Sequence, residues 1–402
     1  MPNQQDQNGL LDRPLVLPCG AVLKNRLIKS AMSDSLGDGA GNATAPQARL
    51  YEKWAEGGVA LAIIGEVQFD PRFPERPGNL VLSDGADVTA LRELTSRASI
   101  NHAHIWPQIG HGGGLSHPPI SNPKGPSPLN IGEFHCDGMS VEDVEQLPAQ
   151  YAQAAVLAKS VGFTGVQIHA GHGFLLSQFL SPLFNRREDQ YGGDVASRCR
   201  IVINVIAAVR EAVGEAFPIG IKINTTDQLD GGLTQTDALA AIGLLDATSL
   251  DLIELSGGSY FPGAASSSDR VASGPYFVEF AEKAKQMTRI PLVVTGGFKT
   301  RAQVVDALAK NAADAVGLAR ALVLAPALPK DWLADNDGNL TFPSFSSPPP
   351  GGITAWFSMR LTAIGNDEEA DFNPELHTAI DEYEARDAAR CAVWKVRFGG
   401  SE

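Results

Sequence analysis

Residues 165–193 read GVQIHAGHGFLLSQFLSPLFNRREDQYGG, and this stretch decides how the rest of the chain is interpreted. It opens with a short apolar run, 166–168, which follows a helical pattern of apolar residues and a break at Gly162. A buried strand that follows a helix is half of a β/α unit. His169 and His172 come directly after the run, at the strand's carboxyl end, where (β/α)₈ barrels build their active sites. The stretch therefore predicts a barrel strand with candidate chemistry at its end.

Three roles suit this pair of histidines. A single histidine near an apolar strand is most often a satisfied structural residue. Two histidines three positions apart could ligate a metal, because imidazole is the commonest metal ligand. Zinc needs a third and a fourth ligand, however, and no Glu or Cys follows at helix or loop spacing. The third role is a pair of N–H donors directed at one oxygen atom, as in an oxyanion hole. Spacing alone ranks the structural role first, the donor pair second and the metal last.

The residues around the histidines change this ranking, because they resemble the substrate-binding stretch of the Old Yellow Enzyme family. These proteins are flavin-dependent oxidoreductases on (β/α)₈ barrels, with the pattern H-x-x-[HN]-G-Y, then F-L-x-P, then N-x-R-x-D-x-Y-G-G. The chain departs from this pattern at Phe174, where most of the family has a tyrosine. The resemblance implies that His169 and His172 are catalytic and that Phe174 and Ser35 border the substrate. The pattern residues that the chain keeps are His169, His172, Gly173, Phe179, Leu180, Pro182, Asn185, Arg187, Asp189, Tyr191, Gly192 and Gly193.

Length and composition agree with a single large domain, and the length would also fit two or three ordinary domains. A chain of 402 residues with 44% hydrophobic residues and 41 glycines suits one barrel with many tight loops. Its formal net charge of −14 argues against nucleic acid or an anionic membrane as a partner, because both would repel the chain. The four cysteines form no C-x-x-C pair, so no zinc ribbon, iron–sulfur cluster or other metal site is expected. We expect small-molecule partners and leave open a homo-oligomer.

The compartment follows from the start of the chain and from its apolar runs. The first residues lack the basic start and apolar core of a signal peptide, and no apolar run reaches the length of a membrane span. A reducing cytoplasm is the simplest expectation.

Apolar runs and helical patterns alternate along most of the chain. Parallel strands need helical crossovers, so this alternation predicts a (β/α)₈ TIM barrel in the α/β class. A hairpin at 15–27 leads into the first strand. The stretch 112–138 after the third strand is rich in Pro, Gly and Ser and is long enough for a lid. The expected strands are 27–32, 60–66, 103–109, 166–168, 218–223, 252–255, 291–294 and 315–318.

The pattern changes after the eighth expected strand. A cluster of Pro and Gly at 348–352 breaks the chain, and helical patterns follow at 355–363 and 374–396. We therefore predict a barrel domain at 1–335. Residues 336–402 are expected to form a C-terminal helical extension that packs on the barrel or on a partner subunit.

A phosphate cradle is expected after strands seven and eight, where these barrels bind phosphate. Strand seven ends in Gly296-Gly297-Phe298 and strand eight in Ala319-Arg320. Glycines let backbone N–H groups approach a phosphate closely, and Arg320 offers a bidentate charge-assisted contact. The alternative is that the glycines only end their strands. Two cradles in the right two loops favour a site for flavin mononucleotide, FMN.

The resemblance assigns further residues to the flavin. Gln108 falls on a glutamine whose amide donates to and accepts from the flavin pyrimidine. Lys222 stands where most members carry an arginine near flavin N1, and a buried lysine without an anion would be costly for any structural role. Ser33 occupies a position near flavin O4 and N5, where it could donate a hydrogen bond, and Val67 would contact the ring through its backbone. Glu66 is expected to be structural. The flavin surface is completed by the residues Ala31 and Met32.

The resemblance implies a two-step reaction. NADH or NADPH reduces the flavin, and hydride is then transferred from flavin N5 to an activated alkene, quinone or nitro compound whose oxygen lies between the two histidines. In the family the tyrosine replaced by Phe174 gives a proton to the α-carbon of the acceptor. Its loss favours an acceptor that needs no proton on carbon, or another donor such as Tyr260 or Tyr276. Two alternatives stay open: a flavin dehydrogenase or demethylase that oxidises an amine or alcohol, and a barrel that binds a ligand without catalysis.

Overall fold

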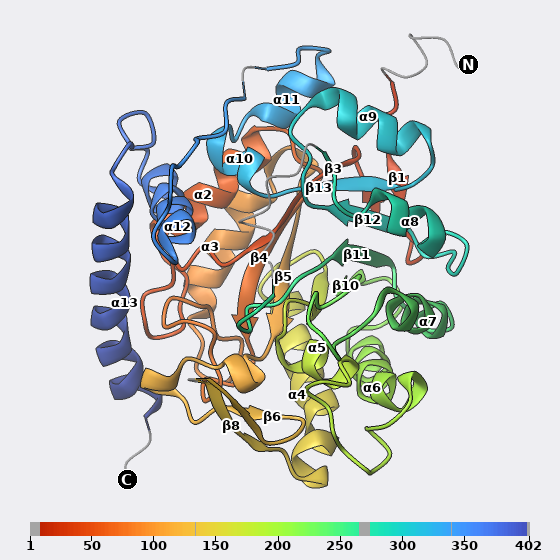
Figure 1. Ribbon diagram of the computed structural model, residues 1–402. Coiled ribbons are helices and arrows are strands. Elements are labelled where there is room, and N and C mark those ends of the chain that lie inside the picture. Colours follow the sequence, from red (N-terminus) through yellow and green to blue (C-terminus); the bar gives the residue numbers. More distant parts are fainter. Residues whose placement is uncertain (1–8, 133, 265–273, 339, 400–402) are drawn as a thin grey trace.

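The computed structural model describes residues 9–132, 134–264, 274–338 and 340–399. Eight parallel strands close into a barrel in which each strand is followed by a helical crossover (Figure 1), so the predicted (β/α)₈ fold is confirmed. In barrel order after β3 the neighbours are β4, β5, β9, β10, β11, β12 and β13, which returns to β3. The strands are β3 (Leu27–Met32), β4 (Leu61–Gln68), β5 (His104–Gly110), β9 (Val166–Ala170), β10 (Ile219–Asn224), β11 (Leu252–Ser256), β12 (Leu292–Thr295) and β13 (Ala315–Leu318).

The crossover helices pack their apolar stripes on the outside of the barrel. They are α2 (Ala45–Glu56), α3 (Val88–Ala98), α4 (Val141–Ser160), α6 (Val195–Val213), α7 (Gln235–Leu245), α8 (Val278–Ala284) and α9 (Arg301–Ala309). Three short helices were not predicted: α5 (Leu175–Leu180), α10 (Arg320–Leu324) and α11 (Leu328–Leu333). Every residue of α5 is buried, including Ser177 and Gln178, so the helix has no exposed face and its six residues show no amphipathic periodicity to detect.

The N-terminal hairpin belongs to the barrel's inner core. Strands β1 (Leu15–Val16) and β2 (Val22–Leu23) pair antiparallel, as predicted. Leu15, Leu17 and Leu23 pack in one cluster with inward-facing strand residues such as Leu61 and Trp106. Burying each such leucine stabilises the fold by roughly 1.5–3 kcal/mol. The opposite end of the barrel, where the strands terminate, is left for polar side chains.

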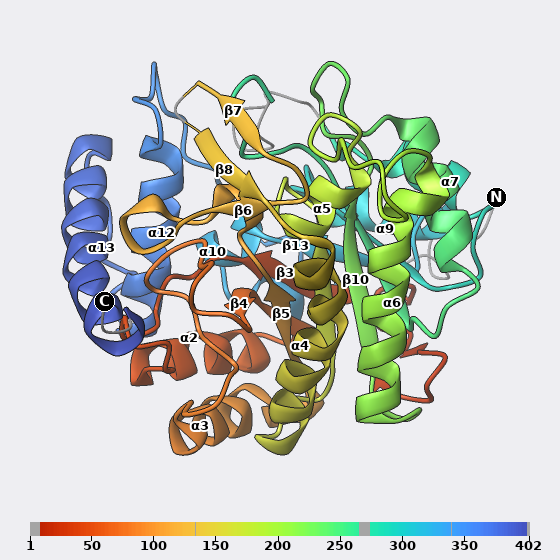
Figure 2. The ribbon, with the colours of Figure 1, turned by 90° about the horizontal axis from the view of Figure 1, so that it is seen from below.

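The predicted lid after the third barrel strand is a small sheet. It consists of β6 (Lys124–Gly125), β7 (Leu129–Ile131) and β8 (Phe134–Gly138), preceded by short 3₁₀ turns at Gly113–Leu115 and Pro118–Ile120. It covers the carboxyl ends of the strands, at the lower end of the barrel in Figure 1 and facing the viewer in Figure 2. Gln178 of α5 accepts a hydrogen bond from Gly114 N (3.0 Å) and so ties the lid to the fourth β/α unit.

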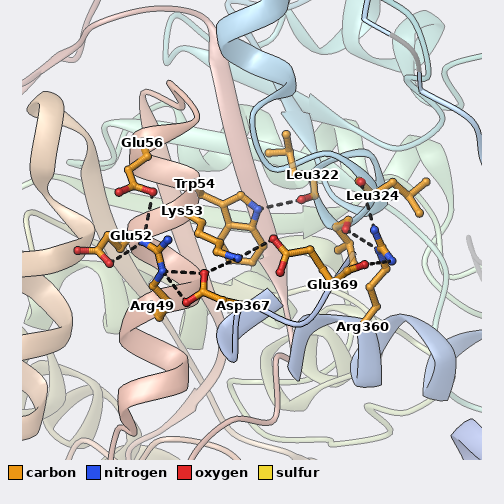
Figure 3. A network of polar contacts seen from close by, with 11 residues as sticks. Arg49, Glu52, Lys53, Trp54, Glu56, Leu322, Leu324, Arg360, Asp367 and Glu369 are labelled. Carbon is orange, nitrogen blue, oxygen red and sulfur yellow. Dashed lines mark hydrogen bonds and ion pairs between the residues drawn. The ribbon is translucent and has the colours of Figure 1, made fainter. Parts of the chain in front are cut away.

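The C-terminal extension forms α12 (Gly352–Gly365) and α13 (Leu376–Phe398), which lie on the α2 side of the barrel. Figure 3 shows its attachment, in which Lys53 Nζ lies 2.8 Å from Asp367 Oδ1 and 2.6 Å from Glu369 Oε1. Arg360 Nε donates to Val323 O (3.1 Å) at the end of the eighth β/α unit. The extension is thus bonded to the barrel of its own chain. The division into domains at residue 335 stays a prediction.

Candidate active site

His169 and His172 lie together at the carboxyl end of β9, with ring centres 5.3 Å apart. His172 has a left-handed backbone, with φ 59°, which is uncommon for a residue other than glycine. Its N–H donates to Asn224 Oδ1 (2.9 Å), and Asn224 Nδ2 donates to Gly258 O (2.8 Å). The loops after β10 and β11 therefore hold His172 in this conformation.

The hydrogen bonds of His169 leave one donor without a partner. Its Nδ1 accepts a hydrogen bond from Gly171 N (3.3 Å), so the ring proton is on Nε2. Nε2 lies 3.0 Å from Glu66 Oε1, but the N–H is not aligned with that oxygen. Within the described part of the chain, this buried N–H has no hydrogen-bond acceptor. A buried donor without an acceptor costs about 1–3 kcal/mol, which an incoming oxygen would recover.

Both imidazoles are neutral at physiological pH. Burial lowers the pKa of His169 to about 3, and the positive charge of Lys222 adds to the effect. Burial, Lys222 and His169 hold the pKa of His172 well below its ordinary value. His172 Nε2 is 2.8 Å from Ser256 Oγ, which can donate to it or accept from it. The pair can therefore act as neutral donors.

Glu66, which was expected to be structural, lies beside His169, with Oε1 3.0 Å from the imidazole Nε2. The register of β4 against β5 shifts between Ile64 and Val67, and Glu66 takes a left-handed φ of 57° within this bulge. The carboxyl group is buried next to His169, and burial raises its pKa to about 8, against the influence of Lys222. Oε2 of Glu66 has no hydrogen-bond partner among the described residues. The sequence offered one signal, a carboxylate at the end of an apolar strand.

Phe174 and Tyr260 complete the aromatic wall of the site. The Phe174 ring is buried, with its centre 5.1 Å from that of His169 and 5.7 Å from that of Tyr260. Tyr260 N donates to His172 O (3.1 Å), and its ring lies 6.1 Å from the His172 ring. Tyr260 is 60% exposed, so its phenol is accessible. Tyr276 instead packs near the phosphate loop, where its N–H donates to Gly296 O (3.2 Å).

A network of buried polar side chains connects the strands inside the barrel beneath the site. Lys222 Nζ is 3.1 Å from Glu254 Oε1, so the lysine has an anion, and the argument against a structural role was wrong. Burial alone would raise the pKa of Glu254, but Lys222, Thr295 and Gln167 together hold it below its ordinary value. Gln108 Nε2 donates to Gln167 Oε1 (2.7 Å), whose Nε2 donates to Glu254 Oε2 (2.6 Å). Lys222 and Gln108 thus share one hydrogen-bonded system centred on Glu254.

The predicted phosphate loop has the backbone that a phosphate site needs. Gly296 and Gly297 have φ values of +123° and +83°, and a Cβ on Gly297 would lie 2.4 Å from Gly274 O. Within the described segments, the N–H groups of Gly297 and Phe298 have no hydrogen-bond acceptor. Arg320 begins α10, directly after the neighbouring strand β13, and its guanidinium lies 5.3 Å from the centre of the Phe357 ring in α12. Two available N–H groups beside an arginine fit the phosphate of FMN.

The end of β3 differs from expectation. Ser33 Oγ donates to Glu75 Oε2 (3.0 Å), so its proton is directed at a half-buried carboxyl group that the sequence did not identify. Ser35 is buried and left-handed, with φ 50°. Of the other residues assigned to the flavin surface, Ala31 and Met32 are half-buried and Val67 is buried. These residues and the histidines come from strands that end at the same face of the barrel.

Comparisons with known proteins place the chain in a family of flavin oxidoreductases. Residues 13–334 match the profile of the NADH:flavin oxidoreductase / NADH oxidase family. An NADH-dependent flavin oxidoreductase of Hypocrea jecorina is 32% identical over 377 residues, covering 83% of this chain and 93% of that protein. An NADPH dehydrogenase of Geobacillus thermodenitrificans is 31% identical, covering 77% of this chain and 90% of that protein. The structure of an old yellow enzyme homologue from Zymomonas mobilis has a TM-score of 0.71 at 20% identity, covering 85% and 98% of the two chains.

Proposed function

The chain belongs to the NADH:flavin oxidoreductase / NADH oxidase family, and we propose that its acceptor is an electrophilic small molecule held by His169 and His172. The protein is an FMN-dependent oxidoreductase that uses a nicotinamide nucleotide. The proposed acceptors are activated alkenes, quinones and nitro compounds, which all carry an oxygen that hydrogen-bond donors can polarise. The observation that carries the proposal is the buried, unpartnered Nε2–H of His169 beside a second neutral imidazole.

Bound FMN supplies two-electron chemistry, because it can take a hydride from a nicotinamide and release it to an acceptor. We propose that Gly296, Gly297, Phe298, Ala319 and Arg320 hold its phosphate. The polar edge of the ring would meet Gln108 and Lys222, whose positions the Glu254 network fixes. The rest of the ring surface would be Ala31, Met32, Ser33 and Val67.

The histidines would orient the acceptor and polarise it. As neutral donors they stabilise negative charge that develops on the acceptor oxygen, without first having to lose a proton. Both rings are fixed before the acceptor arrives, that of His169 by Gly171 N and that of His172 by Ser256 Oγ. Asn224 holds the backbone of His172. Such preorganisation lowers the cost of reaching the transition state. Phe174 and Ser35 would contact the acceptor's remaining surface.

The source of a proton distinguishes the acceptor classes. Hydride addition to an activated alkene requires a proton at the α-carbon, and Phe174 has none to give. Tyr260 lies beside His172 and Phe174 with an accessible phenol, so it is our candidate donor if the acceptor is an alkene. Partial desolvation of the hydroxyl group and the nearby charges of Glu75 and Glu66 raise the pKa of Tyr260, which keeps this group protonated at neutral pH. Quinones and nitro groups need no proton on carbon.

The test is anaerobic reduction of the holoenzyme followed by rapid mixing. NADH and NADPH are each offered as reductant, and the reduced protein is then mixed with cyclohexenone, a quinone, a nitroaromatic compound and oxygen. We expect reduction by at least one nicotinamide and rapid reoxidation by at least one electrophile other than oxygen. Reduction only by an amine or alcohol would replace the proposal with the dehydrogenase alternative. Reoxidation by oxygen alone would contradict the proposed acceptor class.

A further inference from the structure

The C-terminal helix α13 reaches the loops that border the candidate active site. Arg390 Nη1 donates to Ser35 O (2.5 Å), although the two residues are 355 positions apart. Trp394 Nε1 donates to Pro71 O (3.0 Å) in the loop after β4. In Figures 1 and 2, α13 stands along one side of the barrel. The helix thus binds both loops that follow the first two barrel strands.

The backbone conformation of Ser35 needs contacts that stabilise it. Its left-handed φ of 50° is unfavourable for a residue with a side chain, and its buried Oγ has no hydrogen-bond partner among the described residues. A Cβ on Gly78 would lie 2.4 Å from Ser35 Oγ and 3.0 Å from Arg390 Nη1. The loops and the arginine therefore meet at close contact. The charged hydrogen bond from Arg390 is the interaction from α13 that holds the Ser35 carbonyl in place.

A second path of contacts runs from α13 to Ser33. Asp387 Oδ2 lies 4.0 Å from Arg76 Nη1, and the Arg76 guanidinium lies 5.7 Å from the centre of the Tyr383 ring. Arg76 Nε is 3.5 Å from Glu75 Oε1, and Glu75 Oε2 accepts a hydrogen bond from Ser33 Oγ. The helix therefore contacts Ser35 directly and is connected to Ser33 through Arg76 and Glu75.

Charged residues of these loops influence the pKa values of residues around the histidines. Glu75 and Glu66 are close enough that Glu66 helps burial to raise the pKa of Glu75 to about 7, against Arg76. Both carboxyl groups also contribute to the raised pKa of Tyr260. A displacement of the loops would therefore change the surroundings of Glu66, His169 and Tyr260.

We propose that Arg390 is a positioning residue of the active site and that α13 keeps the Ser33–Ser35 segment in the conformation that receives the acceptor. The helix lies outside residues 13–334, which the family profile matches. The inference rests on the proposed function, because that function assigns Ser35 to the acceptor. A helix that only covered the barrel would affect stability but not ligand affinity.

The test compares two arginines of α13 in the holoenzyme. Arg390→Met keeps the aliphatic stem and removes the donors. Arg397→Met is the matched control, because Arg397 Nη2 donates to the carbonyl of Gly85 (2.9 Å), in the turn before α3. The readouts are the dissociation constant of para-chlorophenol, followed by the flavin spectrum, and the separate values of KM and kcat. We expect the dissociation constant of the phenol and the KM of the acceptor to rise about tenfold in Arg390→Met. In Arg397→Met both values should change less than about twofold.

Ser35→Gly separates positioning from stability. Glycine adopts a positive φ at little cost, so Arg390→Met should weaken phenol binding much less in a Ser35→Gly background. If Arg390→Met does not fold, Arg390→Lys takes its place, since it keeps the charge and loses the planar fork. Unchanged phenol affinity in a folded, flavin-loaded Arg390 variant overturns the inference. So does an equal loss in Arg397→Met. Neither of these outcomes affects the proposed function, as long as the wild-type protein binds flavin and reacts with acceptors.

Discussion

At the scale of single residues, the site depends on two histidines whose imidazole rings stay neutral. A neutral imidazole can donate a hydrogen bond to an acceptor oxygen and keep its proton. Burial prevents protonation of both rings, and the nearby charge of Lys222 opposes it further. The sequence identified both residues, but it could not show that His169 keeps an unpartnered N–H.

Removing either donor should slow the acceptor reaction more than flavin reduction. Loss of one donor from an oxyanion-type site costs about 10²- to 10³-fold in rate. We therefore expect His169→Ala and His172→Ala to weaken phenol binding and slow enone reduction, with a smaller change in reduction by NADH or NADPH. Stopped-flow measurement of the two half-reactions checks this. Enone turnover at the wild-type rate in both variants would exclude the histidine clamp.

The phenol group of Tyr260 should determine how fast an activated alkene reoxidises the reduced flavin. Positioned general acids contribute about 10²- to 10⁴-fold, so Tyr260→Phe should slow reoxidation by cyclohexenone and leave reoxidation by a quinone nearly unchanged. Phe174→Tyr should raise the cyclohexenone rate and restore it in the Tyr260→Phe background. Tyr276→Phe is the control, since Tyr276 lies by the phosphate loop. Equal cyclohexenone rates in wild type and Tyr260→Phe would exclude Tyr260 as the donor.

At the scale of elements, the bulge in β4 is the feature that brings a carboxyl group to His169. An uninterrupted strand would keep its alternation of side chains, and the bulge redirects Glu66. The pKa of Glu66 is about 8 in the folded protein and near 4.3 in an unfolded chain. Between these values the folded state holds a proton that the unfolded state has lost. Stability should therefore fall as pH rises from about 4 to 8.

Glu66→Gln should remove this part of the pH dependence. Over the window from pH 5 to 8 the effect in wild type is on the order of 3 kcal/mol, with the full stability present at the acidic end. Denaturant unfolding at pH 5.5 and 8 measures it. A variant whose free energy of unfolding falls with pH as steeply as that of the wild type would mean that Glu66 ionises normally.

At the scale of the whole molecule, the barrel brings a phosphate loop, a polar network and a histidine pair to one face. We expect the purified protein to carry non-covalent FMN, identified by chromatography of the released cofactor. Arg320→Ala should bind FMN about 10- to 100-fold more weakly, because it loses a charged hydrogen bond. Arg289→Ala is the control, since the Arg289 side chain is 92% exposed. Release of FAD, or equal FMN affinity in both variants, would contradict the assignment.

Other properties of the whole chain stay predictions. Among the described helices, none has the length and apolar character needed to cross a bilayer. All four cysteines are free thiols. The cytoplasmic location, the lack of a nucleic-acid partner and the oligomeric state need direct measurement.

The sequence by itself determined the barrel and the identity of its chemistry. Strand and helix periodicities are local, so all eight strands could be placed from apolar runs. The positive φ of Gly296 and Gly297, which we expect to hold a phosphate, suits the glycines found there, because a positive φ is a local demand of the backbone. Helices α10 and α11 were missed because five or six residues are too few to establish a period.

Only the tertiary structure decided which side chains meet. Glu254 against Lys222, Glu66 against His169 and Arg390 against Ser35 join distant segments, and no local pattern specifies such pairs. Closure of the barrel determines these pairs, because it fixes which strand ends are neighbours and which side chains are buried next to one another. Desolvation then sets their charges, which is why the neutral histidines and the protonated Glu66 follow from the fold and not from the residue types.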